Sequence, residues 1–306
     1  MFKKTVFLLL ICSVLCLFSC TDNAQEHQNS QIVATLFPQY DFARQIVKDK
    51  YTVSMLLDPG VESHTFDPSG SDMQTIYSCD LLLYTGDNME PWASTLINND
   101  NCKNKIVDVS KGINLGSFDQ REHSHEHDNL HSLDPHIWTS PKNAKIMVNN
   151  ILESLCEKYP DDKDFFVAGA NELISLLDKL DSDITSIVAN SKRQTLYFGG
   201  RNAFYYLLRD YNLKSVSAYD SCSEGSEPTL KKLAQMSKEI TENNIPVILC
   251  EELGNNKVSK TLGESTGAKT ALFHSCHNLS KRDFEAGKTY IDIMTQNLKV
   301  LQEALN

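Results

Sequence analysis

Positive charge is scarce in this sequence. Its 306 residues include 29 lysines and arginines against 40 aspartates and glutamates, which gives a formal net charge of −11. A protein that binds nucleic acid needs a surface of the opposite sign, because it must neutralise phosphates. The composition therefore excludes nucleic acid as a partner.

Regular cysteine spacing is also missing. No CxxC pair occurs, and the nine cysteines are scattered, which excludes a dense disulfide scaffold. Cys79 and Cys250 stand in apolar runs, so we expect buried thiols there. Cys222 and Cys276 fall in expected loops and are the better candidates for pairing with each other.

The long apolar run of the sequence stands at its N-terminus. "MFKKTVFLLLICSVLCLFSC" has two lysines, followed by an apolar run that only Ser13 interrupts before Ser19. These are the charged and apolar regions of an export signal, and the run is too short to be a comfortable membrane span. Its ending resembles a bacterial lipoprotein box, in which Cys20 becomes the lipidated first residue. Cleavage of a plain signal peptide elsewhere is the alternative.

Strand and helix patterns alternate over the rest of the chain. They form one series before Pro160 and a second series from residue 192 onward. Such alternation predicts an α/β fold with mostly parallel sheets. Between the two series, apolar residues recur at helical spacing for about 30 residues, which predicts a helix roughly 40 Å long with Asp161 or Asp162 as its N-cap. We therefore expect two α/β lobes joined by a long rigid helix.

The expected boundaries follow from these patterns. They are a lipoprotein signal peptide at 1–19, a flexible tether at 20–30, an N-terminal α/β lobe at 31–160 with a histidine-rich loop at 120–135, an interlobe helix at 161–191, and a C-terminal α/β lobe at 192–306.

Three histidines stand where ligands of parallel sheets bind, beyond the carboxyl ends of strands. They are His64, His136 and His274. A single histidine in a loop is more often solvated or hydrogen-bonded locally, but three at equivalent places in two lobes favour a metal site. Imidazole nitrogens suit zinc, whereas calcium and magnesium prefer oxygen ligands.

Two sequence motifs resemble a known family. "PGVESHTFDPS" at 59–69 and "DPHIWTSPKNA" at 134–144 are similar to the two metal motifs of lipoproteins that feed zinc or manganese to ABC importers. The resemblance covers essentially the whole mature chain, including the long helix. It implies that His64 and His136 are metal ligands. It also implies a monomer that is exported, anchored by lipid on Cys20, and faces the periplasm or the extracellular side, with an ABC permease as its partner.

The second half departs from the family pattern. Arg201 stands where the family has a histidine or glutamate ligand, and a guanidinium that stays protonated cannot bind a metal. His274 stands where the family often ends a strand with a liganding aspartate, so His274 is the predicted third ligand. Other residues could replace the lost ligand, namely His277, Glu224, Cys222, Glu227, Glu251, Glu252 and Cys276. We expect Arg201 to point away from the metal or to be neutralised by Glu224, Glu227 or Glu252.

Four further histidines form the insert "REHSHEHDNLH". They are His123, His125, His127 and His131. The insert is acidic and aperiodic, so these residues cannot belong to a core. They resemble the histidine-rich loops of zinc importers and predict weak, multiple metal binding. A mobile loop without a role in metal binding is the alternative.

The function predicted from these features is capture of Zn²⁺ between two lobes and its delivery to an ABC permease. Neutral histidines without a carboxylate should favour zinc over Mn²⁺, which prefers oxygen donors. The alternatives are a manganese-binding member of the same class and a surface adhesin whose metal site is structural. A secreted zinc hydrolase is not expected, because no HExxH or comparable motif supplies a general base.

Overall fold

The computed structural model describes residues 31–97, 99, 102–117, 133–219, 227–253 and 256–306. Residues 31–306 form one compact unit. The predicted signal peptide, tether and Cys20 lie outside the described residues, and so do the four histidines of the insert, Cys222 and Glu224. In the described part of the chain, no helix is both long enough and apolar enough to cross a membrane.

Two parallel four-stranded sheets form the framework. In the first sheet the strand order is β2-β1-β3-β4, with β1 at Gln31–Ala34, β2 at Thr52–Met55, β3 at Leu81–Tyr84 and β4 at Ile106–Asp108. In the second sheet the order is β6-β5-β7-β8, with β5 at Thr195–Phe198, β6 at Lys214–Ser217, β7 at Val247–Cys250 and β8 at Lys269–Leu272. The two sheets thus repeat one topology, which confirms the predicted α/β fold.

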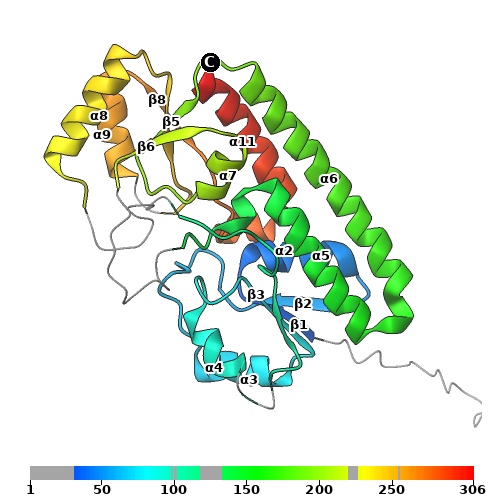
Figure 1. Ribbon diagram of the computed structural model, residues 1–306. Helices are drawn as coiled ribbons and strands as arrows, with labels where there is room; N and C mark the ends of the chain where they lie inside the picture. The colour runs from blue at the N-terminus through cyan, green and yellow to red at the C-terminus, as the bar shows by residue number, and fades with distance from the viewer. Residues whose placement is uncertain (1–30, 98, 100–101, 118–132, 220–226, 254–255) are drawn as a thin grey trace, which may run out of the picture. The chain divides into compact units, whose positions relative to one another are not determined.

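Helices connect the strands and cover the sheets (Figure 1). The α-helices are α2 Phe37–Val47, α3 Gly70–Ser78, α4 Ser94–Ile97, α5 Pro141–Lys158, α6 Lys163–Ala189, α7 Tyr205–Asp210, α8 Leu230–Glu242, α9 Lys257–Thr266, α10 Lys281–Glu285 and α11 Tyr290–Leu305. Short 3-10 turns lie at Pro91–Ala93, Ile137–Thr139 and Pro160–Asp162. The central strand β3 is buried along its whole length, as expected for a parallel strand covered on both faces.

The long helix α6 runs past both sheets (Figure 1). It packs on α2 and α5 beside the first sheet and on α11 beside the second. Its buried stripe includes Phe166, Leu173, Leu177 and Leu180 at helical spacing. Gly169 lets it approach α2 closely, since a Cβ there would stand 2.5 Å from the Ile46 carbonyl oxygen.

The N-terminus of α6 differs in detail from the expected cap. Asp162 occupies the N-cap position, but its side chain makes no capping hydrogen bond. Its carboxylate instead accepts hydrogen bonds from Lys50 and from the Tyr51 hydroxyl. The side chain therefore ties the start of α6 to the segment before β2.

One short segment joins the two halves of the unit. Trp138 is fully buried, and its Nε1 donates to the Ser275 carbonyl at 2.7 Å. The Tyr290 hydroxyl donates to the Trp138 carbonyl at 2.6 Å, and the Tyr206 hydroxyl donates to the Asp134 carbonyl at 2.6 Å. Because all three bonds link residues 134–138 to the second half, this segment holds both sheets in one arrangement.

The cysteine expectations are partly met. Cys79 is buried and free, and Cys250, also free, is half-buried on β7. Cys276 is a free thiol that is fully buried among core residues, so the expected pairing with Cys222 is not formed. The thiol lies 3.8 Å from the His274 carbonyl oxygen, inside the loop that it helps to pack.

A buried polar network lies at the carboxyl ends of β1 and β3. The Glu90 carboxylate accepts hydrogen bonds from the Thr35 hydroxyl and from the backbone N–H of Thr85 at 3.0 Å. Glu90 is only 3% exposed. Burial raises its pKa to about 8, although the hydrogen bonds from Thr35 and Thr85 oppose that change.

This pKa predicts how stability depends on pH. The folded pKa of Glu90 lies above the unfolded value, so the native state keeps a proton that the unfolded chain loses. The contribution is present below the unfolded value of 4.5 and is lost as pH rises through about 8, at up to roughly 1.4 kcal/mol per pH unit. Glu90→Gln keeps the shape without the titration, so its free energy of unfolding should fall less over this range. Urea unfolding of both proteins, with chelator present, measures the difference; equal slopes would contradict the buried acid.

Candidate metal site

His64 and His136 face each other across a small gap. His64 lies in the loop after β2, and His136 directly precedes the turn Ile137–Thr139. Their Nε2 atoms are 3.2 Å apart. Two nitrogens bound to one tetrahedral zinc at normal bond lengths lie about 3.3 Å apart. The spacing therefore suits two ligands of one ion.

His277 is the third imidazole at this place. Its ring centroid lies 6.2 Å from that of His64 and 6.1 Å from that of His136. The residue is 9% exposed, and its Nε2 is buried without a hydrogen-bond partner. A buried nitrogen without a partner costs free energy, so its presence beside two other imidazoles indicates a ligand position. Within the described part of the chain, no three metal-binding side chains stand as close as they would around a bound ion.

His274 lies behind this group. It is buried, and its Nδ1 accepts the backbone N–H of Cys276 at 3.0 Å. The Asn297 side chain holds the backbone N–H and carbonyl of His274 at 2.9 and 2.8 Å. His274 does not line the cavity between the other three rings. The structure thus brings His277, rather than the predicted third ligand, up to His64 and His136.

The loop that carries His277 is fixed by its neighbours. Cys276 adopts a left-handed backbone with φ 65°, a tight turn directly before His277. The Asn278 side chain then donates to the carbonyls of Asp58 and Val61 at 2.8 and 2.7 Å. Because these carbonyls belong to the loop of His64, the two ligand-bearing loops are bonded to each other.

Acidic side chains orient two of the rings. The Asp134 carboxylate lies 3.0 Å from Nδ1 of His136 and accepts its backbone N–H at 2.9 Å. Glu252 lies 3.2 Å from Nδ1 of His277 and accepts the hydroxyl and the backbone N–H of Ser275 at 2.5 and 3.0 Å. A carboxylate at Nδ1 holds the ring proton there, which leaves the Nε2 lone pair for a metal.

Burial lowers the pKa of two of the three imidazoles. Burial, followed by the charges of the neighbouring His136 and His277, lowers the pKa of His64 to about 4. Burial also lowers the pKa of His277. Burial would raise the pKa of Glu252, but nearby His274 and His277 and the hydrogen bonds from Ser275 lower it to about 2. Neutral imidazole is the form that binds metals, so His64 and His277 need no deprotonation at neutral pH.

A cavity of about 20 Å³, room for roughly one water-sized sphere, opens between these groups. It is lined by the three histidines and by charged residues from both halves, namely Glu62, Glu251, Glu252 and Arg201. Ser275, Ala203 and Phe204 complete the lining. Its size and its donors fit a single metal ion.

Arg201 lines this cavity instead of pointing away. Its Nε is buried without a hydrogen-bond partner, and its guanidinium lies 5.7 Å above the Tyr219 ring. Among the described residues, no carboxylate lies within ion-pair distance of it. Burial raises the pKa of Glu251 to about 7, and the charge of Arg201 opposes that change. Glu252 is engaged by Ser275 and His277, and Glu227 is exposed.

The sequence around each clustered histidine shares one feature that marks the residues supporting it. A polar residue stands two positions before each clustered histidine, namely Glu62, Asp134 and Ser275. Each one contacts its histidine, through the backbone N–H of His64 at 3.2 Å, through both nitrogens of His136, and through Nδ1 of His277. The spacing alone could have identified these supports.

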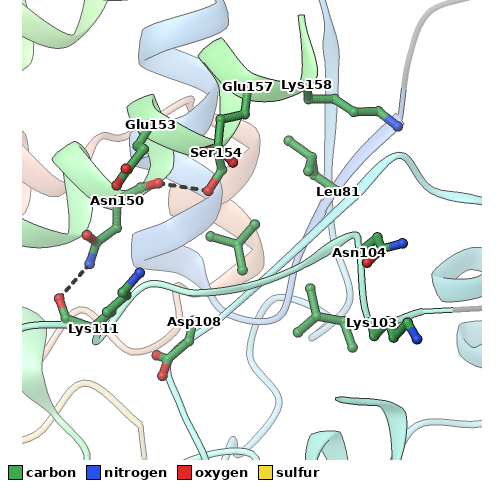
Figure 2. A pocket seen from close by; sticks show the side chains of 12 residues that line it. Leu81, Lys103, Asn104, Asp108, Lys111, Asn150, Glu153, Ser154, Glu157 and Lys158 are labelled. Atoms are coloured by element: carbon green, nitrogen blue, oxygen red, sulfur yellow. Dashed lines mark hydrogen bonds between the residues drawn. The ribbon is translucent and has the colours of Figure 1, made fainter. Parts of the chain in front are cut away.

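A wider groove lies elsewhere, between β4 and α5 (Figure 2). Its volume is about 480 Å³, and Lys103, Lys111, Glu153 and Glu157 are among its lining residues. The Asn150 side chain closes one side by donating to the Lys111 carbonyl at 2.9 Å. No histidine or cysteine lines this groove, so the smaller cavity remains the candidate metal site.

A model of the family described as "ZnuA: Zinc-uptake complex component A periplasmic" matches residues 32–304. The chain belongs to this family. The match spans both sheets, α6 and all three clustered histidines. It agrees with the resemblance that the two histidine motifs indicated.

Two relatives show how far the likeness extends. The chain is 34% identical over 317 residues to the high-affinity zinc uptake system protein ZnuA of Bacillus subtilis (strain 168), covering 100% of this chain and 99% of that protein. It is 32% identical over 306 residues to the zinc-binding lipoprotein AdcA of Streptococcus pneumoniae (strain ATCC BAA-255 / R6). That match covers 98% of this chain but 61% of AdcA, so the chain spans less than two thirds of that relative.

Solved structures share the fold. The Zn(II)-bound ZnuA-like domain of Streptococcus pneumoniae AdcA has a TM-score of 0.77 at 30% identity, covering 90% of this chain and 99% of that one. The laminin-binding protein Lmb of Streptococcus agalactiae, described as bifunctional with adhesin and metal transporting activity, has a TM-score of 0.76 at 26% identity, covering 90% and 100%. The two-lobe α/β architecture of the family is therefore that of this chain.

The hydrogen bonds predict opposite tautomers for neighbouring histidines. In metal-free protein near neutral pH, His136 and His277 should carry the ring proton on Nδ1, because carboxylates accept it there. His274 should carry it on Nε2, because its Nδ1 accepts the Cys276 N–H. Long-range ¹H–¹⁵N correlation spectra distinguish the two forms. Asp134→Asn should shift His136 toward the Nε2–H form, and an Nε2–H form of His136 in the wild type would contradict the assignment.

Proposed function

We propose that this chain captures Zn²⁺ in the cavity between its two lobes and delivers it to an ABC permease. The observation that carries the proposal is the convergence of three imidazoles from both lobes on one ion-sized cavity. His64 and His136 come from the first half, and His277 comes from the second. An ion held in this way bridges the lobes.

The donor set supports zinc as the ligand. Imidazole nitrogens bind zinc well, whereas manganese prefers oxygen donors. Two of the three rings are also held by carboxylates, which fixes their direction and raises their basicity. The relatives named for zinc uptake and zinc binding support the same choice. We therefore infer that Mn²⁺ is the weaker ligand.

We assign the ligand of the second lobe to His277 instead of His274. Nε2 of His277 is buried and has no partner, whereas His274 is held by Cys276 and Asn297 behind the cavity. His274 then serves the site indirectly, as a neighbour of Glu252 at 3.6 Å. We infer a carrier without catalytic activity, because the cargo must leave unchanged.

The remaining expectations belong to the same proposal. The chain is exported, is held at the membrane by lipid on Cys20, and acts as a monomer in which α6 separates an N-terminal lobe at 31–160 from a C-terminal lobe at 192–306. The four histidines of the insert at 120–135 collect zinc weakly. An additional adhesin role is supported by the likeness to laminin-binding proteins, Lmb among them.

The ligand assignment predicts a large difference between two neighbouring histidines. In a background that lacks His123, His125, His127 and His131, His277→Ala should weaken zinc binding by more than the roughly 10- to 100-fold that loss of a supporting hydrogen bond costs. His274→Ala should stay within that range. Competition with a chromophoric chelator measures the affinity, and the zinc-dependent melting shift should fall in parallel, because the ion stabilises only the native state. The reverse order of the two variants would restore His274 as the ligand.

The lipid anchor predicts a change of compartment. Cys20→Ser removes the thiol that would carry the lipid, so the protein should leave the membrane fraction. Stable anchoring takes more than one acyl chain. Without Cys20 no lipid would be attached, so partial retention is not expected. Immunoblots of membrane and soluble fractions measure this. A full-length variant that stays with the membrane would show that Cys20 is not the anchor.

A further inference from the structure

Three histidines leave one position of a four-coordinate zinc ion unassigned. Besides the rings, the cavity offers the oxygens of Glu62, Glu251, Glu252 and Ser275. Ser275 and Glu252 are bonded to each other at 2.5 Å and both lie at Nδ1 of His277. They support a ligand and are not available to act as one.

Glu251 is also committed. Its carboxylate lies against Gly200, since a Cβ added to Gly200 would stand 3.2 Å from Oε1 of Glu251. It accepts the backbone N–H of Arg201, and the charge of Arg201 acts on it more strongly than any other charge. Glu251 thus holds the loop that carries the arginine.

Glu62 remains as a donor. It is half-buried, and it stands two residues before His64, whose backbone N–H donates to its Oε1 at 3.2 Å. The described residues supply no other hydrogen bond to this carboxylate, so its second oxygen is available to the cavity. Burial raises the pKa of Glu62, but the His64 N–H and the charge of nearby His277 bring it below its usual range. The carboxylate therefore lies near rings of both lobes.

The charges of the cavity favour the same donor. Three carboxylates and one guanidinium line it, which leaves two negative charges when all are ionised and the imidazoles are neutral. A dication balances this charge. A carboxylate that binds the metal directly also shields it from Arg201, which cannot be deprotonated. This accounts for an arginine in a metal cavity without any additional anion.

We propose that Glu62 is the fourth zinc ligand, so that one loop supplies two ligands, Glu62 and His64. The assignment rests on the proposed zinc capture. It places three of the four ligands, with His136, in the first lobe and only His277 in the second. The ion would then stay bound mainly to the first lobe, and loss of the single bond to His277 of the second lobe would begin its release.

The test compares two isosteric amides in the background without the four insert histidines. Glu62→Gln and Glu62→Ala should both weaken zinc binding by at least roughly tenfold. Glu251→Gln, a matched change in the same cavity, should weaken binding less than Glu62→Gln, and Glu153→Gln, in the separate groove, should leave the affinity unchanged. If Glu62 only anchors the loop, Glu62→Gln will bind like the wild type, because its amide oxygen still accepts the His64 N–H, and only Glu62→Ala will be impaired. That result, or a larger loss in Glu251→Gln, overturns the proposal.

Cobalt gives a second measurement, again in the background without the four insert histidines, so that only the cavity contributes to the spectrum. Co²⁺ in place of zinc shows visible bands that report its ligands. With Glu62 bound, azide should leave the spectrum unchanged in this background and alter it when Glu62→Gln is added. An azide response with Glu62 intact would mean that water holds the fourth position, which overturns the proposal even if the Glu62 variant fails to fold. A wild type that binds no zinc would instead refute the proposed function.

Discussion

The bond between Trp138 and the Ser275 carbonyl is the contact on which the rest of the site depends. The Trp138 indole is fully buried, and its Nε1 donates across the two halves of the unit at 2.7 Å. Each of these residues stands two positions from a clustered histidine, Trp138 after His136 and Ser275 before His277. This buried hydrogen bond, together with those from Tyr290 to the Trp138 carbonyl and from Asn278 to the His64 loop, sets the distance between the two lobes at the cavity. A buried indole without its acceptor would cost free energy, so the arrangement is strongly specified.

Hydrogen bonding also explains how three imidazoles coexist in one small space, with His136 and His277 buried and His64 half-buried. Close rings that were all charged would repel each other, and burial disfavours the charged form further. The carboxylates of Asp134 and Glu252 stabilise the proton on Nδ1 of two rings. The buried Nε2 of His277 is left without a partner, and this is a local cost that binding of an ion offsets.

Arg201 shows how a family site can tolerate an apparently incompatible residue. Its guanidinium lies over Tyr219 and shares the cavity with three carboxylates, so the local charge stays negative despite the arginine. A cation near a metal site is unfavourable only when nothing compensates it. In this cavity the compensation comes from Glu62 and Glu251, which stand in separate loops and are 189 positions apart in the chain.

The sequence by itself determined the framework and half of the site. The apolar spacing from Phe166 to Ile184 requires a long helix with one buried stripe, and alternating strands and helices require parallel sheets. The motifs around His64 and His136 are local, since proline and acidic neighbours fix those loops within a few residues. Local chemistry of this kind can be read directly from the chain.

Only the tertiary structure decided which residue of "HSCHN" reaches the cavity. His274 ends a strand and looked better oriented, but Asn297 of α11 holds its backbone and Cys276 holds its ring. The left-handed turn at Cys276 and the bonds from Asn278 to the His64 loop bring His277 forward instead. Asn278 is more than 200 positions from the carbonyls that it binds in the His64 loop. Asn297, which holds His274, belongs to a separate helix. No spacing within the loop could reveal them, because the outcome depends on long-range packing.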